Sequence, residues 1–143
     1  MDRFVSHLTV KLDAKGRASI PAAFRTVLGR DGHEGLYIHP SLDKPALDAG
    51  GHALIREIDM LLSRYEPFSD AWEVLSTALN GESEIVKMDP EGRIVLSERL
   101  KARAFITDDI TVVGLGHKFQ MWEPTRFAEH RAKAMDAMRA YRR

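Results

Sequence analysis

One short motif occurs twice in the chain, and this internal repeat constrains the fold more than any other feature of its 143 residues. Residues 10–17 read VKLDAKGR and residues 86–93 read VKMDPEGR, so five of the eight positions are identical at a constant offset of 76. The match continues weakly at the same offset, where Ile20 aligns with Leu96, Phe24 with Leu100 and Arg25 with Lys101. The pattern indicates a duplicated structural unit.

The first copy predicts a β-hairpin followed by a short helix. Apolar and polar residues alternate over residues 7–12, which is typical of a strand with one buried face. Residues 13–16 read as a turn, because an Asp side chain can accept hydrogen bonds from turn amides and Gly adopts positive φ without strain. A second strand over 17–20 completes the hairpin. Pro21 then suits the start of a helix that Gly29 ends.

The second copy follows the same plan, and further elements extend both halves. Strands are expected at 85–88 and 93–96 around a turn at 89–92, followed by a helix that Ser97 caps. The pattern also predicts a strand over 35–39, a hairpin of 110–115 with 118–122, and a loop from Asp43 to Gly51. Apolar stripes predict helices over 54–65 and 70–79, the second with a capping arrangement at Asp70, and a last helix from Pro124.

These elements divide the chain into four parts. Residues 5–55 form the first repeat, 56–81 a helical connector, 82–125 the second repeat and 126–143 a basic C-terminal helix or tail. Because the tail is basic, three roles stay open for it: helping to bind a polyanion such as DNA, covering a neighbouring protomer, or disorder. The last two combined are favoured.

Composition excludes several classes of protein. A content of 44% hydrophobic and 29% charged residues is ordinary for a soluble globular chain. The absence of cysteine excludes disulfides, Cys-based zinc sites and thiol nucleophiles. No apolar run approaches the roughly 18 residues of a membrane span, and the first residues lack the pattern of a signal peptide. These absences favour the cytoplasm and predict no membrane partner.

The net charge is zero, but the basic residues gather at both ends of the chain. Residues 1–30 hold six basic and two acidic residues, residues 126–143 hold the same numbers, and the middle of the chain is acidic. Such asymmetry is typical of a basic face that binds a polyanion. Ordinary surface charge explains it equally well at this point.

The sequence resembles the MraZ family over most of its length. The resemblance is carried by LDAKGR at 12–17 followed by SIPAAFR at 19–25, by the second D-x-x-G-R at 89–93, and by VVGLGHKFQMW at 112–122. It implies an α+β, mainly β fold in which two tandem swapped-hairpin, AbrB-like β-barrel repeats form an intrachain pseudo-dimer with inserted and C-terminal helices. It also implies a ring homo-oligomer that is associated with the nucleoid. Such a protein would regulate transcription by binding double-stranded DNA at direct repeats in the promoter of the division and cell-wall gene cluster that contains its own gene.

The resemblance places the DNA contacts on the two hairpins. By position, the DNA-binding residues are Lys11, Lys15, Arg17, Lys87 and Arg93. The residues expected to order the turns are Asp13, Gly16, Asp89 and Gly92.

Each type of side chain has a role that its chemistry suggests. An arginine such as Arg17 can bind the O6 and N7 atoms of guanine with two hydrogen bonds. Lysines such as Lys11 and Lys15 bind phosphates without reading sequence, and Asp13 can hold the guanidinium of Arg17 in position. Where the first copy has Lys15, the second has Glu91, which phosphates repel. We therefore expect the first hairpin to be the main reader of DNA.

Two other classes of function compete with a DNA-binding regulator. The first is an oligomeric protein-interaction scaffold with only nonspecific DNA affinity. The second, a small enzyme, is disfavoured because no convergent acid, base and nucleophile are visible. The six histidines show no metal-binding spacing, so neither a metal, another cofactor nor a small-molecule substrate is expected.

Overall fold

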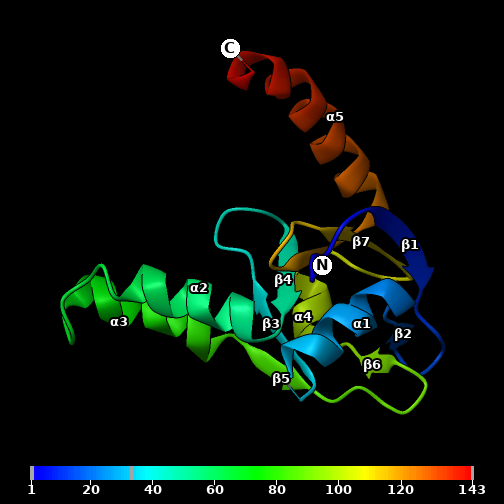
Figure 1. Ribbon diagram of the computed structural model, residues 1–143, viewed down its shortest axis with the longest axis horizontal. Helices are drawn as coiled ribbons and strands as arrows, with labels where there is room; N and C mark the ends of the chain where they lie inside the picture. The colour runs from blue at the N-terminus through cyan, green and yellow to red at the C-terminus, as the bar shows by residue number, and fades with distance from the viewer. Residues whose placement is uncertain (1, 33, 143) are drawn as a thin grey trace.

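The computed structural model describes residues 2–32 and 34–142 and has an α+β fold, as the sequence predicts (Figure 1). Its main element is a six-stranded antiparallel sheet in the order β1-β7-β8-β4-β3-β5. These strands are β1 (His7–Lys11), β3 (Leu36–Pro40), β4 (Ala46–Gly50), β5 (Glu84–Val86), β7 (Asp109–Gly114) and β8 (Phe119–Trp122). A separate two-stranded ribbon pairs β2 (Arg17–Ser19) with β6 (Arg93–Val95). The closed β-barrel that the resemblance implies is not found within the described residues, since β1 and β5 are the two edges of an open sheet.

The two repeats exchange strands, so the simple hairpins expected from the alternating pattern are wrong. After the turn at 13–16 the chain diverges: β1 pairs with β7, whereas β2 pairs with β6. In the second repeat β5 pairs with β3 instead of β6. An alternating pattern determines which face of a strand is buried, but it does not determine which strand is its partner.

Helices cover the sheet and extend from it. They are α1 (Ala22–Asp31), α2 (His52–Leu62), α3 (Asp70–Ser76), a π-helical turn η1 (Thr77–Gly81), α4 (Glu98–Arg103) and α5 (Pro124–Tyr141). The Ser97 hydroxyl accepts a hydrogen bond from the backbone N–H of Leu100, which confirms the predicted cap of α4. Two details differ from the prediction. Helix α1 continues past Gly29 and ends at Gly32, whose φ of 76° lets its N–H reach back into the helix, and Ser69 caps α3 in place of Asp70.

The main core lies between the sheet, the ribbon and helices α1 and α4. Its centre is an aromatic group in which the rings of Phe4, Phe24 and Phe119 lie 4.9–5.2 Å apart. Ala18 and Ile94 of the ribbon are also buried in this core, at 3% and 1% exposure. The ribbon is therefore held rigidly from one side.

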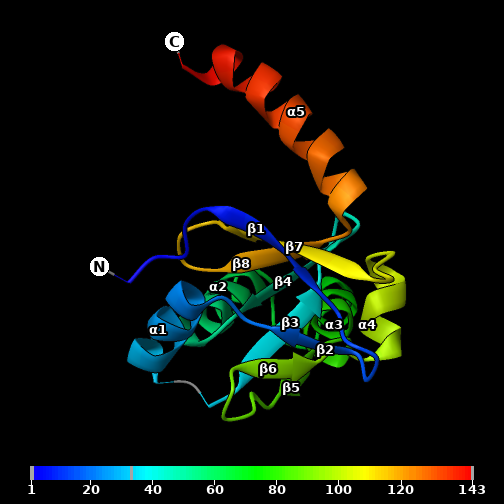
Figure 2. The same ribbon diagram turned by 90° about the vertical axis from the view of Figure 1, so that its right-hand side faces the viewer.

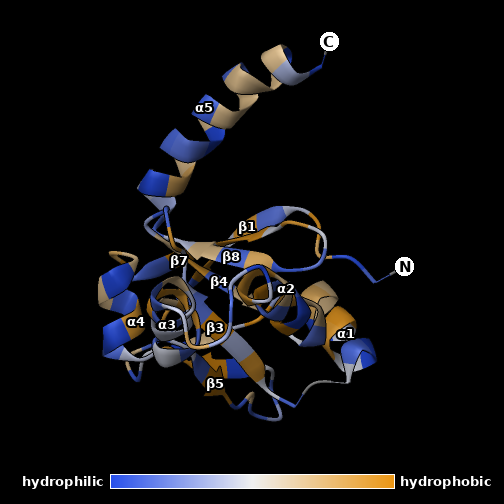
Figure 3. Cartoon of the chain, turned by 90° about the vertical axis from the view of Figure 1, so that its left-hand side faces the viewer, coloured by the Kyte–Doolittle hydropathy of each residue, from blue (hydrophilic) through white to orange (hydrophobic). Residues whose placement is uncertain are grey.

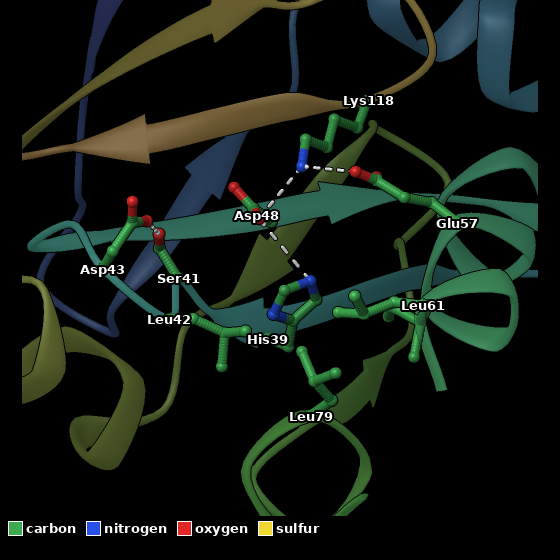
Figure 4. A pocket seen from close by; sticks show the side chains of 10 residues that line it. His39, Ser41, Leu42, Asp43, Asp48, Glu57, Leu61, Leu79 and Lys118 are labelled. Atoms are coloured by element: carbon green, nitrogen blue, oxygen red, sulfur yellow. Dashed lines mark hydrogen bonds and ion pairs between the residues drawn. The ribbon is translucent and has the colours of Figure 1, made fainter. Parts of the chain in front are cut away.

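The loop expected from Asp43 to Gly51 is wrong, because its second half is the central strand β4. All five residues of β4 are buried, and the strand pairs with β3 on one side and β8 on the other. The nearby proline and glycines indicated a turn, but Pro45 and Gly51 lie just outside a short strand whose last residue is Gly50. Its polar residue Asp48 is buried and accepts a hydrogen bond from Lys118 (Figure 4) and another from Gln120.

Two helical arms project from the body in different directions. Helices α2 and α3 form one arm and α5 the other (Figure 1), and α5 leaves the body on the side opposite to β2 and β6 (Figure 2). Polar and apolar residues are mixed along α5 (Figure 3). No described helix has both the length and the apolar character needed to cross a bilayer.

Candidate nucleic-acid interface

The turn of the first repeat, residues 13–17, is held together by one carboxylate. Oδ1 of Asp13 accepts hydrogen bonds from the backbone N–H groups of Lys15 and Arg17, both at 2.9 Å. Oδ2 accepts a charged hydrogen bond from Nε of Arg17 at 2.6 Å. Gly16 has a φ of 76° and donates its N–H to the carbonyl of Asp13. We call residues 11–17 the first tip.

The second repeat reproduces this geometry in residues 87–93, the second tip. Asp89 accepts from the backbone N–H groups of Glu91 and Arg93 at 3.0 and 2.9 Å, and from Nε of Arg93 at 2.8 Å. Gly92 has a φ of 81° and donates to the carbonyl of Asp89. The two D-x-x-G-R motifs thus fold into the same turn, and each places an arginine at the start of a ribbon strand.

These hydrogen bonds lower the pKa of both carboxylates. The backbone N–H and the guanidinium of Arg17 lower the pKa of Asp13 from 3.8 to about 2. The corresponding groups of Arg93 lower the pKa of Asp89, and the bond to Asp89 raises the pKa of Arg93. Both tips therefore keep their carboxylate–guanidinium pair at neutral pH.

The order of the first tip is expected to be lost only in strong acid. A carboxylate with a lowered pKa stabilises the folded turn above its unfolded pKa, and this contribution disappears as the pH falls from about 4 through 2. Amide NMR shifts of Lys15 and Arg17 should follow a titration with a midpoint near pH 2. The Asp13→Asn variant should show no such step, and a wild-type midpoint near 4 would contradict the hydrogen-bonded geometry.

The ribbon joins the two tips on one solvent-facing surface. In its antiparallel register Arg17 lies opposite Val95 and Ser19 lies opposite Arg93. These four residues share one face, because their neighbours Ala18 and Ile94 point into the core. The two arginines consequently lie near opposite ends of a short exposed strip.

The two tips differ in the charge that is free to bind a polyanion. In the first tip, Lys11 and Lys15 are exposed and form no ion pair with any described residue, while Asp13 is the single acid. In the second tip, Arg93 is held by Asp89 and also by Glu91, whose Oε2 lies 2.6 Å from Nη2. Lys87 is exposed there, but two acids balance the two bases.

Two further cations lie beside the tips, and the sequence reasoning did not select them. The side chain of Arg25 of α1 packs against Gly92 of the second tip. A Cβ added to Gly92 would lie only 2.5–2.8 Å from the side chain of Arg25. Lys101 of α4 lines a surface pocket together with Lys15 and Gly16 of the first tip, and it pairs with Glu98. Arg25 and Lys101 lie 76 positions apart, which is the offset of the repeat, so the sequence contained a signal that they occupy equivalent positions. Each tip is thus flanked by a cation from the other repeat.

Comparison with known proteins gives consistent matches. A family model described as “MraZ protein, putative antitoxin-like” matches residues 79–142. The chain is 60% identical over 142 residues to the “Transcriptional regulator MraZ” of Xanthobacter autotrophicus, covering 99% of this chain and 90% of that protein. It is also 60% identical over 143 residues to the protein of that name from Methylocella silvestris, covering 100% of this chain and 87% of the relative. The corresponding Beijerinckia indica protein is 58% identical over 143 residues, with 100% and 87% covered. On these identities over essentially its whole length, the chain belongs to the MraZ family.

Proposed function

We propose that this protein is a sequence-specific DNA-binding regulator of transcription. Its proposed targets are direct repeats in the promoter of the division and cell-wall gene cluster that contains its own gene. The observation that carries the proposal is the first tip, an exposed turn with two unpaired lysines and an arginine aligned by Asp13. The relatives' name, transcriptional regulator, supports the same role.

The bond between Asp13 and Arg17 suits the reading of a base. Asp13 engages Nε, so Nη1 and Nη2 are the nitrogens left to donate to O6 and N7 of a guanine in the major groove. A side chain already held in position loses less conformational freedom on binding than a free arginine does. The discrimination expected from one such contact is roughly 1–3 kcal/mol.

Lys11 and Lys15 supply affinity that does not depend on sequence. Their exposed ammonium groups can bind backbone phosphates on either side of the contacted base. Each neutralised phosphate releases counterions, so the affinity should fall steeply as salt is added. Arg25 and Lys101 extend the same cationic surface in this proposal.

The strand exchange supports the proposed swapped-hairpin architecture. Since β2 of the first repeat pairs with β6 of the second, the two related tips lie at the ends of one ribbon, as the proposed pseudo-dimer would require. A single tip offers few base contacts and so modest affinity. In a ring of protomers, tandem DNA repeats could be bound together, and effective concentration would increase the avidity by about 10²–10⁴.

Binding in the presence of competitor DNA tests this function. At physiological salt the protein should prefer promoter repeats from its own gene cluster to a scrambled duplex of equal length and composition. A protein-interaction scaffold with only nonspecific DNA affinity would bind both duplexes equally. Equal binding would therefore overturn the proposal.

The second tip is expected to bind DNA more tightly once Glu91 is replaced. Glu91→Lys removes the second carboxylate from Arg93 and gives the tip the charge pattern of the first. We expect the affinity to rise by about 3- to 10-fold and the salt dependence to become steeper, measured by fluorescence anisotropy at several salt concentrations. Glu129→Lys on α5 makes the same change in net charge away from the tips. An equal gain in both variants would show that net charge alone is responsible.

A further inference from the structure

Helix α5 is fixed firmly at its base. Both carboxylate oxygens of Glu123 accept hydrogen bonds from the first turn, from the N–H groups of Arg126 at 2.9 Å and Thr125 at 3.1 Å. Phe127 is buried in a small cluster with Trp122, and the ring of His130 stacks on Trp122 at 4.4 Å. The direction in which the helix leaves the body is therefore set by packing.

Beyond this base, α5 has no partner within the described chain. All residues from 131 to 142 are exposed, and they include Met135, Met138 and Tyr141. Met138 and Tyr141 are three residues apart and so share a face of the helix. A projecting helix of this length is marginally stable in water unless its apolar face packs on something. The combination of a firm base and an uncovered apolar face indicates a docking arm.

The α2–α3 arm contains a groove whose aromatic and acidic lining suits the exposed apolar and basic side chains of α5. The groove lies between the two helices, is open to solvent and has a volume of about 480 Å³. It is lined by the aromatic rings of Tyr65 and Trp72, by Pro67 and by the acid Asp59. Ser76 also lines it, and its buried Oγ has no hydrogen-bond partner among the described residues. Aromatic rings beside a carboxylate form a favourable site for an arginine or a methionine.

The charges of the two arms are complementary. The α2–α3 arm, residues 52–82, carries six acidic and two basic residues, whereas residues 126–142 of α5 carry five basic and two acidic residues. The two arms project from the body in different directions (Figure 1), and residues 131–142 of α5 are all exposed, so α5 does not cover the other arm of its own chain.

We propose that the exposed half of α5 docks into the α2–α3 groove of a second copy of this chain. The donor arm and the acceptor groove are different surfaces, so the contact is head-to-tail, and it can repeat from copy to copy until a ring closes. The proposal specifies the contact behind the ring assembly proposed above and rests on that part of the proposed function. Its test requires no DNA, so the two proposals can fail separately.

Because the natural chain has no cysteine, crosslinking can locate the contact directly. Met138→Cys labels the arm and Ser63→Cys labels the groove. When the two single variants are mixed with a short bis-maleimide, a mixed dimer is expected to accumulate. Thr26→Cys on α1 replaces the groove variant as the control and should give about tenfold less product. Equal yields with both partners would overturn the proposal.

Sedimentation of the whole protein gives the second test. The Met135→Glu/Met138→Glu variant changes only exposed side chains, and it should weaken self-association by at least about tenfold while circular dichroism stays unchanged. A wild-type chain that remains monomeric at all concentrations, or a double variant that assembles like wild type, would overturn the docking. A double variant that assembles normally but loses DNA affinity would assign α5 to DNA instead.

Discussion

Arg17→Lys is expected to lower the preference for promoter repeats over scrambled DNA by about 10- to 100-fold at each site. Lysine keeps the positive charge, but it has neither the planar fork that donates to O6 and N7 nor the Nε that Asp13 holds. The loss corresponds to roughly 1–3 kcal/mol of discrimination between bases. Affinity for scrambled DNA should change little, because phosphate binding requires charge alone. Competition between the two duplexes at fixed salt measures both quantities.

Arg93→Lys is the matched control for this experiment. Arg93 has the same turn geometry, but Glu91 occupies a second nitrogen, so its replacement should change the preference by less than about threefold. Circular dichroism must show that both variants stay folded. If Arg93→Lys abolished the preference while Arg17→Lys left it intact, the assignment of the first tip as the main reader would be wrong.

Lys118→Met is expected to destabilise the fold by about 3 kcal/mol. Asp48 is only 6% exposed, and its Oδ2 lies 3.3 Å from Nζ of Lys118 (Figure 4). Although burial disfavours the charged lysine, Asp48 and Glu57 raise the pKa of Lys118, so it remains charged at neutral pH. Removing the ammonium leaves a buried carboxylate with a hydrogen bond from Gln120 at 2.8 Å and a longer contact to Nε2 of His39 at 3.6 Å. Breaking a buried pair by deleting one partner costs about 3–5 kcal/mol. The Gln120 bond places our expectation at the low end of that range.

Urea denaturation followed by circular dichroism measures this loss. Lys15→Met removes an exposed cation of the first tip and, measured without DNA, should change the free energy of unfolding by less than about 0.5 kcal/mol. Combining Asp48→Asn with Lys118→Met removes the uncompensated charge and should recover at least half of the loss. A Lys118→Met variant as stable as wild type would show that the pair does not stabilise the junction of β4, β8 and α2.

The local chemistry of the fold could be predicted from the sequence, but the partners of its strands could not. The turns at 13–16 and 89–92, the cap at Ser97 and the start of α5 follow from side chains that bond to their own backbone neighbours. The exchange of strands between repeats depends on pairs of residues about 75–105 positions apart, and an alternating pattern carries no information on such pairs. β4 was missed because Pro45 before it and the glycines at positions 50 and 51 gave a stronger local signal than the burial of its five residues.

The candidate site, too, could be predicted from the sequence only in its local features. The D-x-x-G-R motifs pointed to the two tips, and the replacement of Lys15 by Glu91 in the second copy indicated their different charge. The second carboxylate on Arg93 requires coordinates, because it depends on the orientation of an exposed side chain. The placement of Arg25 beside Gly92 also depends on the packing of one repeat against the other.

The unequal charges of the two tips give each chain a polarity. A ribbon with identical ends would look the same after half a rotation and would suit an inverted, palindromic sequence. Here one end is cationic and the other is neutralised by Glu91, so a half rotation exchanges unlike ends. A protomer of this kind can distinguish the two directions along a duplex. Copies that follow one another head to tail would then all face the same way, and sites that repeat in one orientation would match them.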